Sequence, residues 1–378
     1  MNNHTTDRVT QAHFASLLIS GRQLIDMRAP IEFSRGSFPA AINLPLMTDD
    51  ERARVGTCYA EHGEVAAIAL GHELVSGKSK EARIALWVAA TIRDPDAVLY
   101  CLRGGLRSQT AQSWLAEAGV KVPIIDGGYK ALRRFMIDTF DTQLQHSQVV
   151  VLAGKTGSAK TSLLVTSDDG SRLPCIDLEG LAHHRGSAFG RRIVPQPTQI
   201  DFENQISLAL LRLHHNEQKT IALEDESRLI GRCALPLNLQ AKMRESPLVV
   251  VEATLLERVH HSWENYILSN YEEHLREAGT KDLAFVAFSE SLRASLGNIR
   301  KRLGNPRFEQ LSEVLEQALT AHDSGDPEPH KEWIEILLRD YYDPMYDYQL
   351  KSKQREIIYR GNFKAVREFL LDRTLRRA

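Results

Sequence analysis

The stretch VVVLAGKTGSAKTSLL, residues 149–164, constrains the fold more than any other part of the chain. An aliphatic run long enough for one buried strand enters a loop with two glycines, and an apolar helical pattern follows directly. A strand that passes into a helix through a glycine-bearing loop is typical of parallel α/β sheets, in which amides at the helix N-terminus bind phosphate. The chain is therefore expected to contain a parallel sheet with a phosphate-binding loop at its edge.

This loop follows the pattern G-x-x-x-x-G-K-T, with Ala159 at the position of the second glycine. Its backbone amides would face phosphate oxygens, and Lys160 would neutralise the outer charge. Thr161 is the candidate metal ligand, with Mg²⁺ as the ion that would accompany the phosphates, and no tightly bound cofactor is expected. The absence of the second glycine weakens the case for a nucleotide hydrolase, and a loop that holds a diphosphate without hydrolysing ATP is one option. The predicted diphosphate-binding residues are Gly154, Lys155, Thr156, Gly157, Ser158, Ala159, Lys160 and Thr161.

Short apolar runs alternate with helical patterns over about the first 255 residues, which predicts an α/β protein with mostly parallel sheets. Beyond that point the chain becomes helical and charged. We expect a first domain at 1–140, a phosphate-loop domain at 147–255 and a helical extension of that domain at 256–378. The predicted strands include QLIDMR, AAINLPL, AVLYCL and VPIIDGG in the first domain, and VVVLA, LPCID, TIALE and LVVVE in the second.

Charge and cysteine usage exclude several classes of protein. A formal net charge of −2 does not suggest indiscriminate binding of nucleic acid. The polar N-terminus lacks the apolar core of a signal peptide, and no apolar run approaches the ~18 residues that span a bilayer. We expect a cytoplasmic protein with no membrane partner. Neither a zinc site nor a disulfide framework is expected, because no C-x-x-C pair occurs among Cys58, Cys101, Cys175 and Cys233.

A second loop, VLYCLRGGLRSQ at residues 98–109, is built around a cysteine. Cys101 ends a predicted strand and precedes a helix start, where amides and the helix N-terminus favour a thiolate and bind an anion beside it. Arg103 and Arg107 add positive charge, and the two glycines let the backbone turn tightly around the sulfur. The pattern predicts a nucleophilic or chalcogen-carrying cysteine, with Cys101, Arg103 and Arg107 as catalytic residues.

The segment LIDMRAPIEFSRGSFPAAINLPL, residues 24–46, resembles the opening signature of rhodanese domains, and Cys101 falls where rhodaneses carry their persulfide cysteine. Five residues separate Cys101 from Arg107, where rhodanese sulfurtransferases usually have four. The longer spacing is also the signature of cysteine phosphatases, and it makes a larger anion pocket. That pocket would hold a tetrahedral phosphate or a phosphate-linked chalcogen donor. The residues that match the signature are Asp26, Arg28, Glu32, Gly36, Pro39, Ala41, Asn43 and Pro45.

Other candidate residues lie at predicted strand ends or in glycine-flanked loops. The strand TIALE ends in Glu224 and is followed by Asp225 and Glu226; an acid at such a strand end commonly touches a phosphate-bound metal or its water. Arg185, in the loop AHHRGSAFG, is a candidate ligand for the diphosphate or for a tRNA phosphate. Cys58 is a candidate second chalcogen-handling residue, although an unreactive core thiol is the simpler interpretation.

The combination resembles the family of bacterial tRNA 2-selenouridine synthases from about residue 8 to about residue 365. Beyond the two loops, several stretches carry this resemblance: VGTCYAEHGEVAAIALGHELV (55–75), DGGYKALRR (126–134), DLEGLAHHRGSAFG (177–190), QPTQIDFEN (196–204) and EDESRLIG (224–231).

The resemblance implies an enzyme that acts on a tRNA with 2-thiouridine at the wobble position. It implies two steps, which are S-geranylation from geranyl diphosphate and replacement of the geranylthio group by selenium from selenophosphate. Selenophosphate and its synthetase are then expected partners. The phosphate loop would hold the diphosphate, and Cys101 would bind selenophosphate or carry selenium as a selenosulfide.

Three alternatives remain open at this point. An ATP-dependent tRNA thiolase would need a competent nucleotide site, which Ala159 disfavours. A rhodanese-fold phosphatase would suit the cysteine–arginine spacing but not the attached phosphate-loop domain. A regulatory module that senses a phosphorylated metabolite would have no use for the intact cysteine loop.

Overall fold

The computed structural model describes residues 8–165, 173–353 and 355–375. The chain forms two compact units: residues 1–145 with 198–212, and residues 146–197 with 213–378. Each unit contains a parallel sheet with helices, so the predicted α/β class is confirmed. Within the described residues, no helix combines the length and the apolar character needed to cross a membrane.

The first unit is built on a five-stranded sheet in the order β1-β5-β4-β2-β3, with every neighbouring pair parallel. The strands are short and almost wholly apolar, as expected where helices cover both faces. Because all strands run the same way, the loops that carry chemistry leave from one edge of the sheet. The strands are β1 (Arg8–Val9), β2 (Leu24–Asp26), β3 (Ala41–Asn43), β4 (Val98–Tyr100) and β5 (Ile124–Ile125).

The core of this unit lies on both faces of the sheet, because successive residues of a strand point to opposite sides. Ile25 and Leu99 belong to the cluster on one face, together with the fully buried Trp87. Leu24 and Val98 belong to the cluster on the other face. The helices are α1 (Phe14–Ser20), α2 (Pro30–Phe33), α3 (Asp49–Leu74), α4 (Gly77–Arg93), α5 (Leu106–Glu117) and α6 (Gly128–His146).

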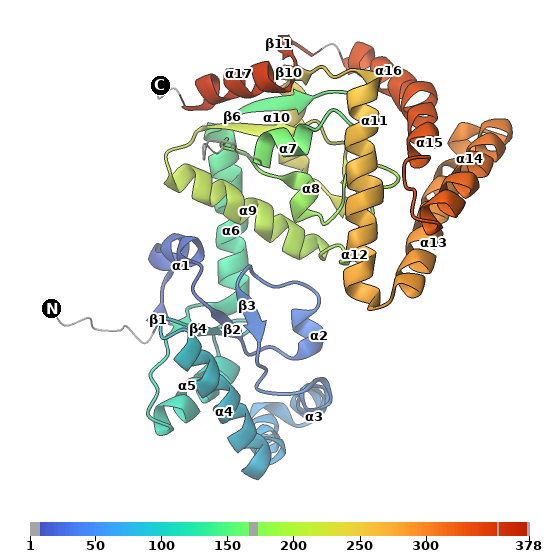
Figure 1. Cartoon of the computed structure of the whole chain (residues 1–378). Helices are drawn as coiled ribbons and strands as arrows, with labels where there is room; N and C mark the ends of the chain where they lie inside the picture. Colours follow the sequence, from blue (N-terminus) through green and yellow to red (C-terminus); the bar gives the residue numbers. More distant parts are fainter. Residues whose placement is uncertain (1–7, 166–172, 354, 376–378) are drawn as a thin grey trace. The chain divides into compact units, whose positions relative to one another are not determined.

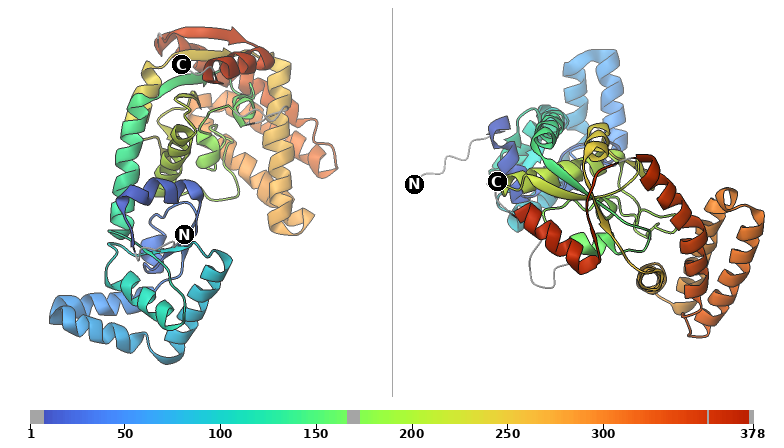
Figure 2. Two further views of the ribbon diagram at one scale, coloured as in Figure 1. Left: turned by 90° about the vertical axis from the view of Figure 1, so that its left-hand side faces the viewer. Right: turned by 90° about the horizontal axis from the view of Figure 1, so that it is seen from above.

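Helix α3 folds back on itself, because a Cβ added at Gly71 of its second arm would lie 3.9 Å from a methyl group of Val55 in its first arm. The two arms are the neighbouring blue helices in Figure 2. A capping box starts α3, in which the hydroxyl of Thr48 accepts from the Glu51 amide and the Glu51 carboxylate accepts from the Thr48 amide. The helix kinks at Gly63, whose φ of 81° no helical residue adopts. The sequence VGTCYAEHGEVAAIALGHELV therefore forms both arms of one kinked helix.

The first unit also takes in most of helix α9 (Gln199–His215), which follows β6 and precedes β7 of the second sheet in sequence. Leu208 and Leu211 lie in the same core cluster as Phe14. Polar contacts add to this: Asn204 is fully buried and accepts a hydrogen bond from Arg133 at 2.6 Å. These contacts explain the stretch QPTQIDFEN as a packing segment of the first unit.

The second unit has a four-stranded parallel sheet in the order β11-β10-β6-β7. Strand β11 comes from the C-terminal region, which the sequence pattern indicates only as helical. Its residues Ile357, Ile358 and Tyr359 are only half-buried at the sheet edge, and a run this short shows no clear periodicity. The strands are β6 (Gln148–Ala153), β7 (Thr220–Glu224), β10 (Leu248–Val251) and β11 (Ile357–Gly361), with a separate antiparallel pair of β8 (Leu229–Ile230) and β9 (Cys233–Ala234).

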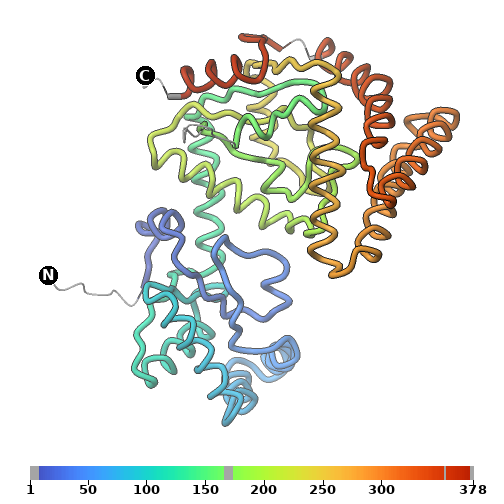
Figure 3. The backbone as a smooth tube through the Cα atoms, in the orientation of Figure 1, coloured from blue at the N-terminus to red at the C-terminus, as the bar shows by residue number. Residues whose placement is uncertain are grey.

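The helices from α11 to α15 share a second core in this unit, centred on Phe288, Leu315 and Trp333. Figure 3 shows α13 and α14 as neighbouring helices joined by a tight turn at Gly304. The helices of the unit are α7 (Lys160–Val165), α8 (Leu178–Leu181), α10 (Leu237–Glu245), α11 (Leu255–Trp263), α12 (Ser269–Ala278), α13 (Lys281–Leu303), α14 (Asn305–Asp323), α15 (His330–Leu337), α16 (Asp343–Lys353) and α17 (Phe363–Leu375).

A buried ion pair holds the end of β2 in the first unit. The guanidinium of Arg28 donates to the carboxylate of Asp26 at 2.7 Å and to the carbonyl of Gly36 at 2.9 Å. Both side chains are buried, and the ring of Tyr129 lies 3.9 Å from the guanidinium carbon. The pair therefore ties the strand end to the loop after α2 and to the start of α6.

Replacement of Arg28 by alanine is expected to destabilise the first unit by about 3–5 kcal/mol, because it leaves Asp26 buried and unpaired. The measurement is hydrogen-exchange mass spectrometry of the peptide that contains β4. Arg134→Ala is the matched control, because Arg134 and Asp138 form an exposed pair that contributes at most about 0.5 kcal/mol. Equal protection in both variants would contradict the assigned role.

Candidate functional site

The cysteine loop of the first unit is held in place by the start of helix α6. Cys101 directly follows β4 and is 3% exposed. The amides of Tyr129 and Lys130 donate to the carbonyls of Cys101 and Leu102 at 2.8 and 3.1 Å. At Gly128, with φ of 59°, a Cβ would lie 2.3 Å from the Cys101 carbonyl oxygen. Gly128, the second glycine of the DGGYK stretch, is therefore required for helix α6 to approach the cysteine loop this closely.

The sulfur of Cys101 lies at the N-terminal turn of α5. Its Sγ is 3.2 Å from the hydroxyl of Ser108, which is fully buried. Ser108 was not among the residues that the sequence analysis selected, although it directly follows Arg107. The same hydroxyl lies 3.1 Å from the carbonyl of Gly105, so its single proton can be donated either to that oxygen or to the sulfur.

The two arginines of the loop differ in their environment. Arg107 donates to both oxygens of Glu32, at 2.5 and 3.2 Å, and Arg52 lies 3.2 Å from the same carboxylate. Although burial alone would raise the pKa of Glu32, its pairing with Arg107 lowers it, so the pair is held charged. Arg103 is exposed and has no ion-pair partner in the described parts of the chain. Arg103 is thus the cation of this loop that is free to meet an incoming anion.

A cavity of about 580 Å³ opens beside Cys101 and is lined by residues of the first unit, including Arg103 and Arg107. Cys58 lies on α3, half-buried, but is not among the residues that line this cavity. The structure therefore brings together the three predicted catalytic residues and leaves Cys58 outside their cavity.

In the second unit, the phosphate loop joins β6 to α7, which begins at Lys160. Ala159 adopts φ of 60°, a left-handed conformation that strains a residue with a Cβ and that the usual glycine adopts freely. The loop conformation is thus kept in spite of the substitution. At Gly154 a Cβ would lie 2.6 Å from the Ser158 hydroxyl, so this position does require glycine.

The two lysines of the loop point to different partners. Lys160 donates to the carbonyl of Gly154 at 2.9 Å, so its ammonium lies over the loop itself. Lys155 instead pairs with Asp343 and Asp347 at the start of α16, at 3.3 and 3.4 Å. Lys160 is therefore the lysine placed to meet a phosphate bound on the loop.

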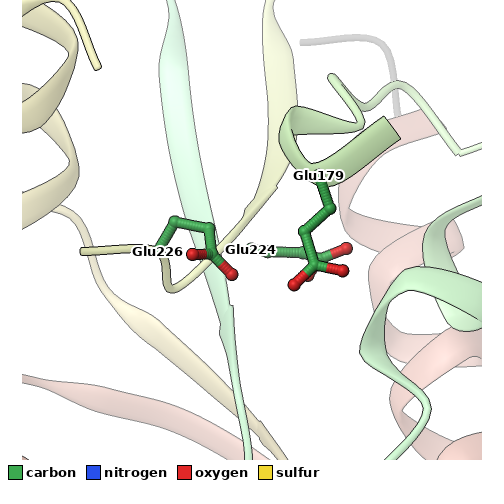
Figure 4. Close-up of side chains that lie close together, drawn as sticks. All are labelled: Glu179, Glu224 and Glu226. Atoms are coloured by element: carbon green, nitrogen blue, oxygen red, sulfur yellow. The ribbon is translucent and has the colours of Figure 1, made fainter. Parts of the chain in front are cut away.

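Three glutamates converge beside the loop, as Figure 4 shows. Glu224 ends β7, Glu226 follows two residues later, and Glu179 comes from α8. One carboxylate oxygen from each lies within 4.8 Å of the others, and the hydroxyl of Thr161 donates to Glu179 at 3.1 Å. Of these glutamates, Glu224 and Glu226 are among the acids that the sequence places at the end of the strand TIALE. Glu179 lies in the DLEGLAHHRGSAFG stretch, which gave no sign that it would meet β7.

The three glutamates hold protons unusually strongly. Burial, together with the neighbouring carboxylates, raises the pKa of Glu179 and of Glu224 to about 8 and that of Glu226 to about 7. The Oε1 atom of Glu224 is buried and has no hydrogen-bond partner among the residues that the structure describes. Hard oxygen donors crowded in this way fit a divalent cation such as Mg²⁺, which would relieve their mutual repulsion.

The glutamates and the phosphate loop line one polar cavity of about 340 Å³. Arg185 and Arg192 also line it, and each has a buried guanidinium nitrogen that finds no hydrogen-bond partner within the described ranges. Arg185 is further held by Glu273 at 2.9 Å. Asp225 lines the cavity as well, but its carboxylate pairs with Arg355 at 2.9 Å. The cavity therefore presents carboxylates for a cation and unpaired arginine donors for an anion.

Comparison with known proteins gives two domain matches. Residues 147–377 match the family described as the tRNA 2-selenouridine synthase AAA domain, and residues 10–134 match the rhodanese-like domain. They confirm the predicted order of a rhodanese-like part followed by a phosphate-loop part.

Similarity to curated proteins extends over nearly the whole chain. A tRNA 2-selenouridine synthase of Hahella chejuensis is 53% identical over 358 residues, which cover 94% of this chain and 93% of that protein. One of Marinobacter nauticus is 47% identical over 366 residues, with 96% and 97% covered. Among solved structures, the N-terminal domain of a putative ATP/GTP binding protein from Clostridium difficile 630 is 35% identical in sequence. The match covers 30% of this chain and 88% of the other protein's chain. Its TM-score of 0.29 is too low to inform the fold.

The glutamate cluster predicts a stability that depends on pH. Folding raises these pKa values from 4.5, so the folded state binds more protons than the unfolded state, and stability falls as pH rises from about 4.5 to about 8. The thermal midpoint in EDTA is expected to drop between about pH 5.5 and about pH 8.5 more in the wild type than in the Glu179→Gln/Glu226→Gln variant. Mg²⁺ should restore the wild-type midpoint at the higher pH. Parallel curves for both proteins would contradict the assignment.

The contact between Ser108 and Cys101 predicts a change in thiol reactivity. Ser108→Ala is expected to slow alkylation of Cys101 by iodoacetamide about fivefold, because one hydrogen bond to the thiolate, worth about 1 kcal/mol, is lost. Peptide mass spectrometry follows the modification of this cysteine separately from the other three. Ser113→Ala on the exposed side of α5 is the control and should react as the wild type does.

Proposed function

This chain belongs to the tRNA 2-selenouridine synthase family, and on that premise we propose that it converts 2-thiouridine at the wobble position of a tRNA into 2-selenouridine. The observation that carries the proposal is that the similarity to named synthases, 53% identity to one of them, extends over almost the whole chain. The chain also has both a cysteine loop and a phosphate loop. The proposed route has two steps, geranylation of sulfur and its replacement by selenium.

The first step makes the sulfur a better leaving group. The sulfur of 2-thiouridine attacks C1 of geranyl diphosphate; the new C–S bond forms as the C–O bond breaks, diphosphate leaves, and N3 of the base gives up its proton. The polar cavity of the second unit supports this assignment, because Lys160 and the unpaired donors of Arg185 and Arg192 offer positive charge to the departing diphosphate.

The glutamate cluster is the proposed site of Mg²⁺ in this step. Glu179, Glu224 and Glu226 would hold the ion, with the hydroxyl of Thr161 beside them. Bound there, Mg²⁺ would neutralise charge that develops on the diphosphate. Without a cation, three carboxylates next to a diphosphate would repel it.

The second step takes place at Cys101. The selenium of selenophosphate attacks C2 of the base, and the C2–Se bond forms as the C2–S bond breaks. The electron pair of the C2–S bond leaves with the geranyl sulfur, which takes up a proton to become geranylthiol. Water then cleaves the P–Se bond, so that phosphate is released and selenium stays on C2. Cys101 lines the cavity in which selenophosphate would bind, and the free charge of Arg103 would attract this anion.

The direct test is mass spectrometry of nucleosides from 2-thiouridine tRNA incubated with the pure protein. Geranyl diphosphate is added first and selenophosphate second, with Mg²⁺ and no ATP. A geranylthio nucleoside followed by a selenonucleoside is the expected result. An unchanged tRNA would overturn the proposal. A thiolated tRNA formed with ATP and a persulfide donor would then favour the thiolase, and hydrolysis of an aryl phosphate would favour the phosphatase.

Two substitutions should separate the steps. Cys101→Ala is expected to abolish selenation and to leave geranylation largely intact, because the polar cavity does not include the cysteine. Lys160→Ala should slow geranylation at least about a hundredfold, as removal of one charged donor to a leaving group does, and still permit selenation of tRNA that was geranylated chemically.

Arg244→Ala, at an exposed position on α10, controls for the loss of one positive charge and should match the wild type in both steps. Loss of both activities in Cys101→Ala would point to a structural role for the cysteine.

A further inference from the structure

The cavity beside Cys101 is mostly apolar, although the loop next to it carries arginines for an anion. Leu46, Met47 and Val55 line it together with Ile68, Leu106 and Trp114. Its volume of about 580 Å³ is far larger than a phosphate-sized ligand requires and lies in the range of pockets for small organic molecules. A tetrahedral anion at the arginines would leave these apolar walls unused.

Large apolar side chains also lie exposed around the same cavity. Tyr59 is 59% exposed, Leu106 53% and Ile68 37%, and all three line it. Apolar surface gathered at a concave site costs free energy in water and marks a ligand site more often than chance exposure does. Cys101 lies in the same cavity. A ligand that fits it would therefore carry a hydrocarbon group close to its reacting atom.

We propose that this cavity binds the geranyl chain of an S-geranyl-2-thiouridine in tRNA while C2 of its base lies at Cys101. The inference rests on the proposed function and adds to it the place where the second step recognises its substrate. The geranyl chain has ten carbons and no polar group, so its apolar surface matches the apolar side chains that line the cavity. The sulfur between chain and base would lie at the cysteine end, near the charge of Arg103.

This placement explains how selenation would follow geranylation. An unmodified 2-thiouridine has no hydrocarbon group that could be buried in the cavity, so it would bind more weakly than the geranylated nucleoside. When C2–Se forms and C2–S breaks, the geranylthiolate takes up a proton, and the departing geranylthiol remains in an apolar site. The cavity thus selects the activated nucleoside and accommodates the leaving group.

The test compares two tRNAs whose 2-thiouridine is alkylated chemically, one with a geranyl group and one with the five-carbon dimethylallyl group. Single-turnover selenation with selenophosphate is measured for each by nucleoside mass spectrometry. The wild type should prefer the geranyl substrate by about tenfold or more, which corresponds to about 1.4 kcal/mol. In the variant Ile68→Gln/Leu106→Gln this preference should fall to near unity.

The control is Val65→Gln/Leu86→Gln, which replaces two exposed apolar side chains of α3 and α4 that do not line the cavity. It should keep the wild-type preference, and thermal midpoints should show that both variants are folded. If the cavity variant keeps the geranyl preference, or slows both substrates equally, the inference is wrong. If the wild type forms no selenonucleoside from either tRNA, the proposed function itself has failed.

Discussion

Parallel strands are the constraint on which the rest of this structure depends. In both units every strand of the main sheet runs in one direction, so the carboxyl ends of neighbouring strands meet at one edge. Cys101 follows β4 at such an edge, and the phosphate loop follows β6. Glu224, at the end of the adjacent β7, comes to lie beside that loop for the same reason.

The two edges differ in the chemistry that they expose. The edge of the first unit combines a buried sulfur, one free arginine and a largely apolar cavity. The edge of the second unit combines three protonatable glutamates with arginine donors that have no partner. An apolar cavity suits a hydrocarbon next to a nucleophile, whereas the crowded charges suit a diphosphate with its cation. A two-step transfer would make use of both.

Close backbone approach shapes both loops, but in different ways. Gly128 is required because a Cβ would collide with the cysteine loop. Ala159 shows that the phosphate loop keeps its left-handed turn even with a Cβ present, at the cost of about 1–2 kcal/mol of strain. The surrounding contacts, such as Lys160 to the Gly154 carbonyl, hold the turn. The missing glycine therefore says little about the shape of the loop.

The sequence by itself determined the α/β class, the two loops and the family, because each depends on local patterns: an apolar run, a glycine at a turn, a cysteine before a helix. Tertiary structure alone decided that Arg107 pairs with Glu32 and Arg103 does not, that Glu179 joins Glu224 and Glu226, and that most of α9 packs with the first unit. The strand β11 was also not predictable from sequence periodicity, because it is short and only half-buried. These contacts join residues that are distant in the chain, and their partners depend on which faces of the sheets and helices meet in the folded protein.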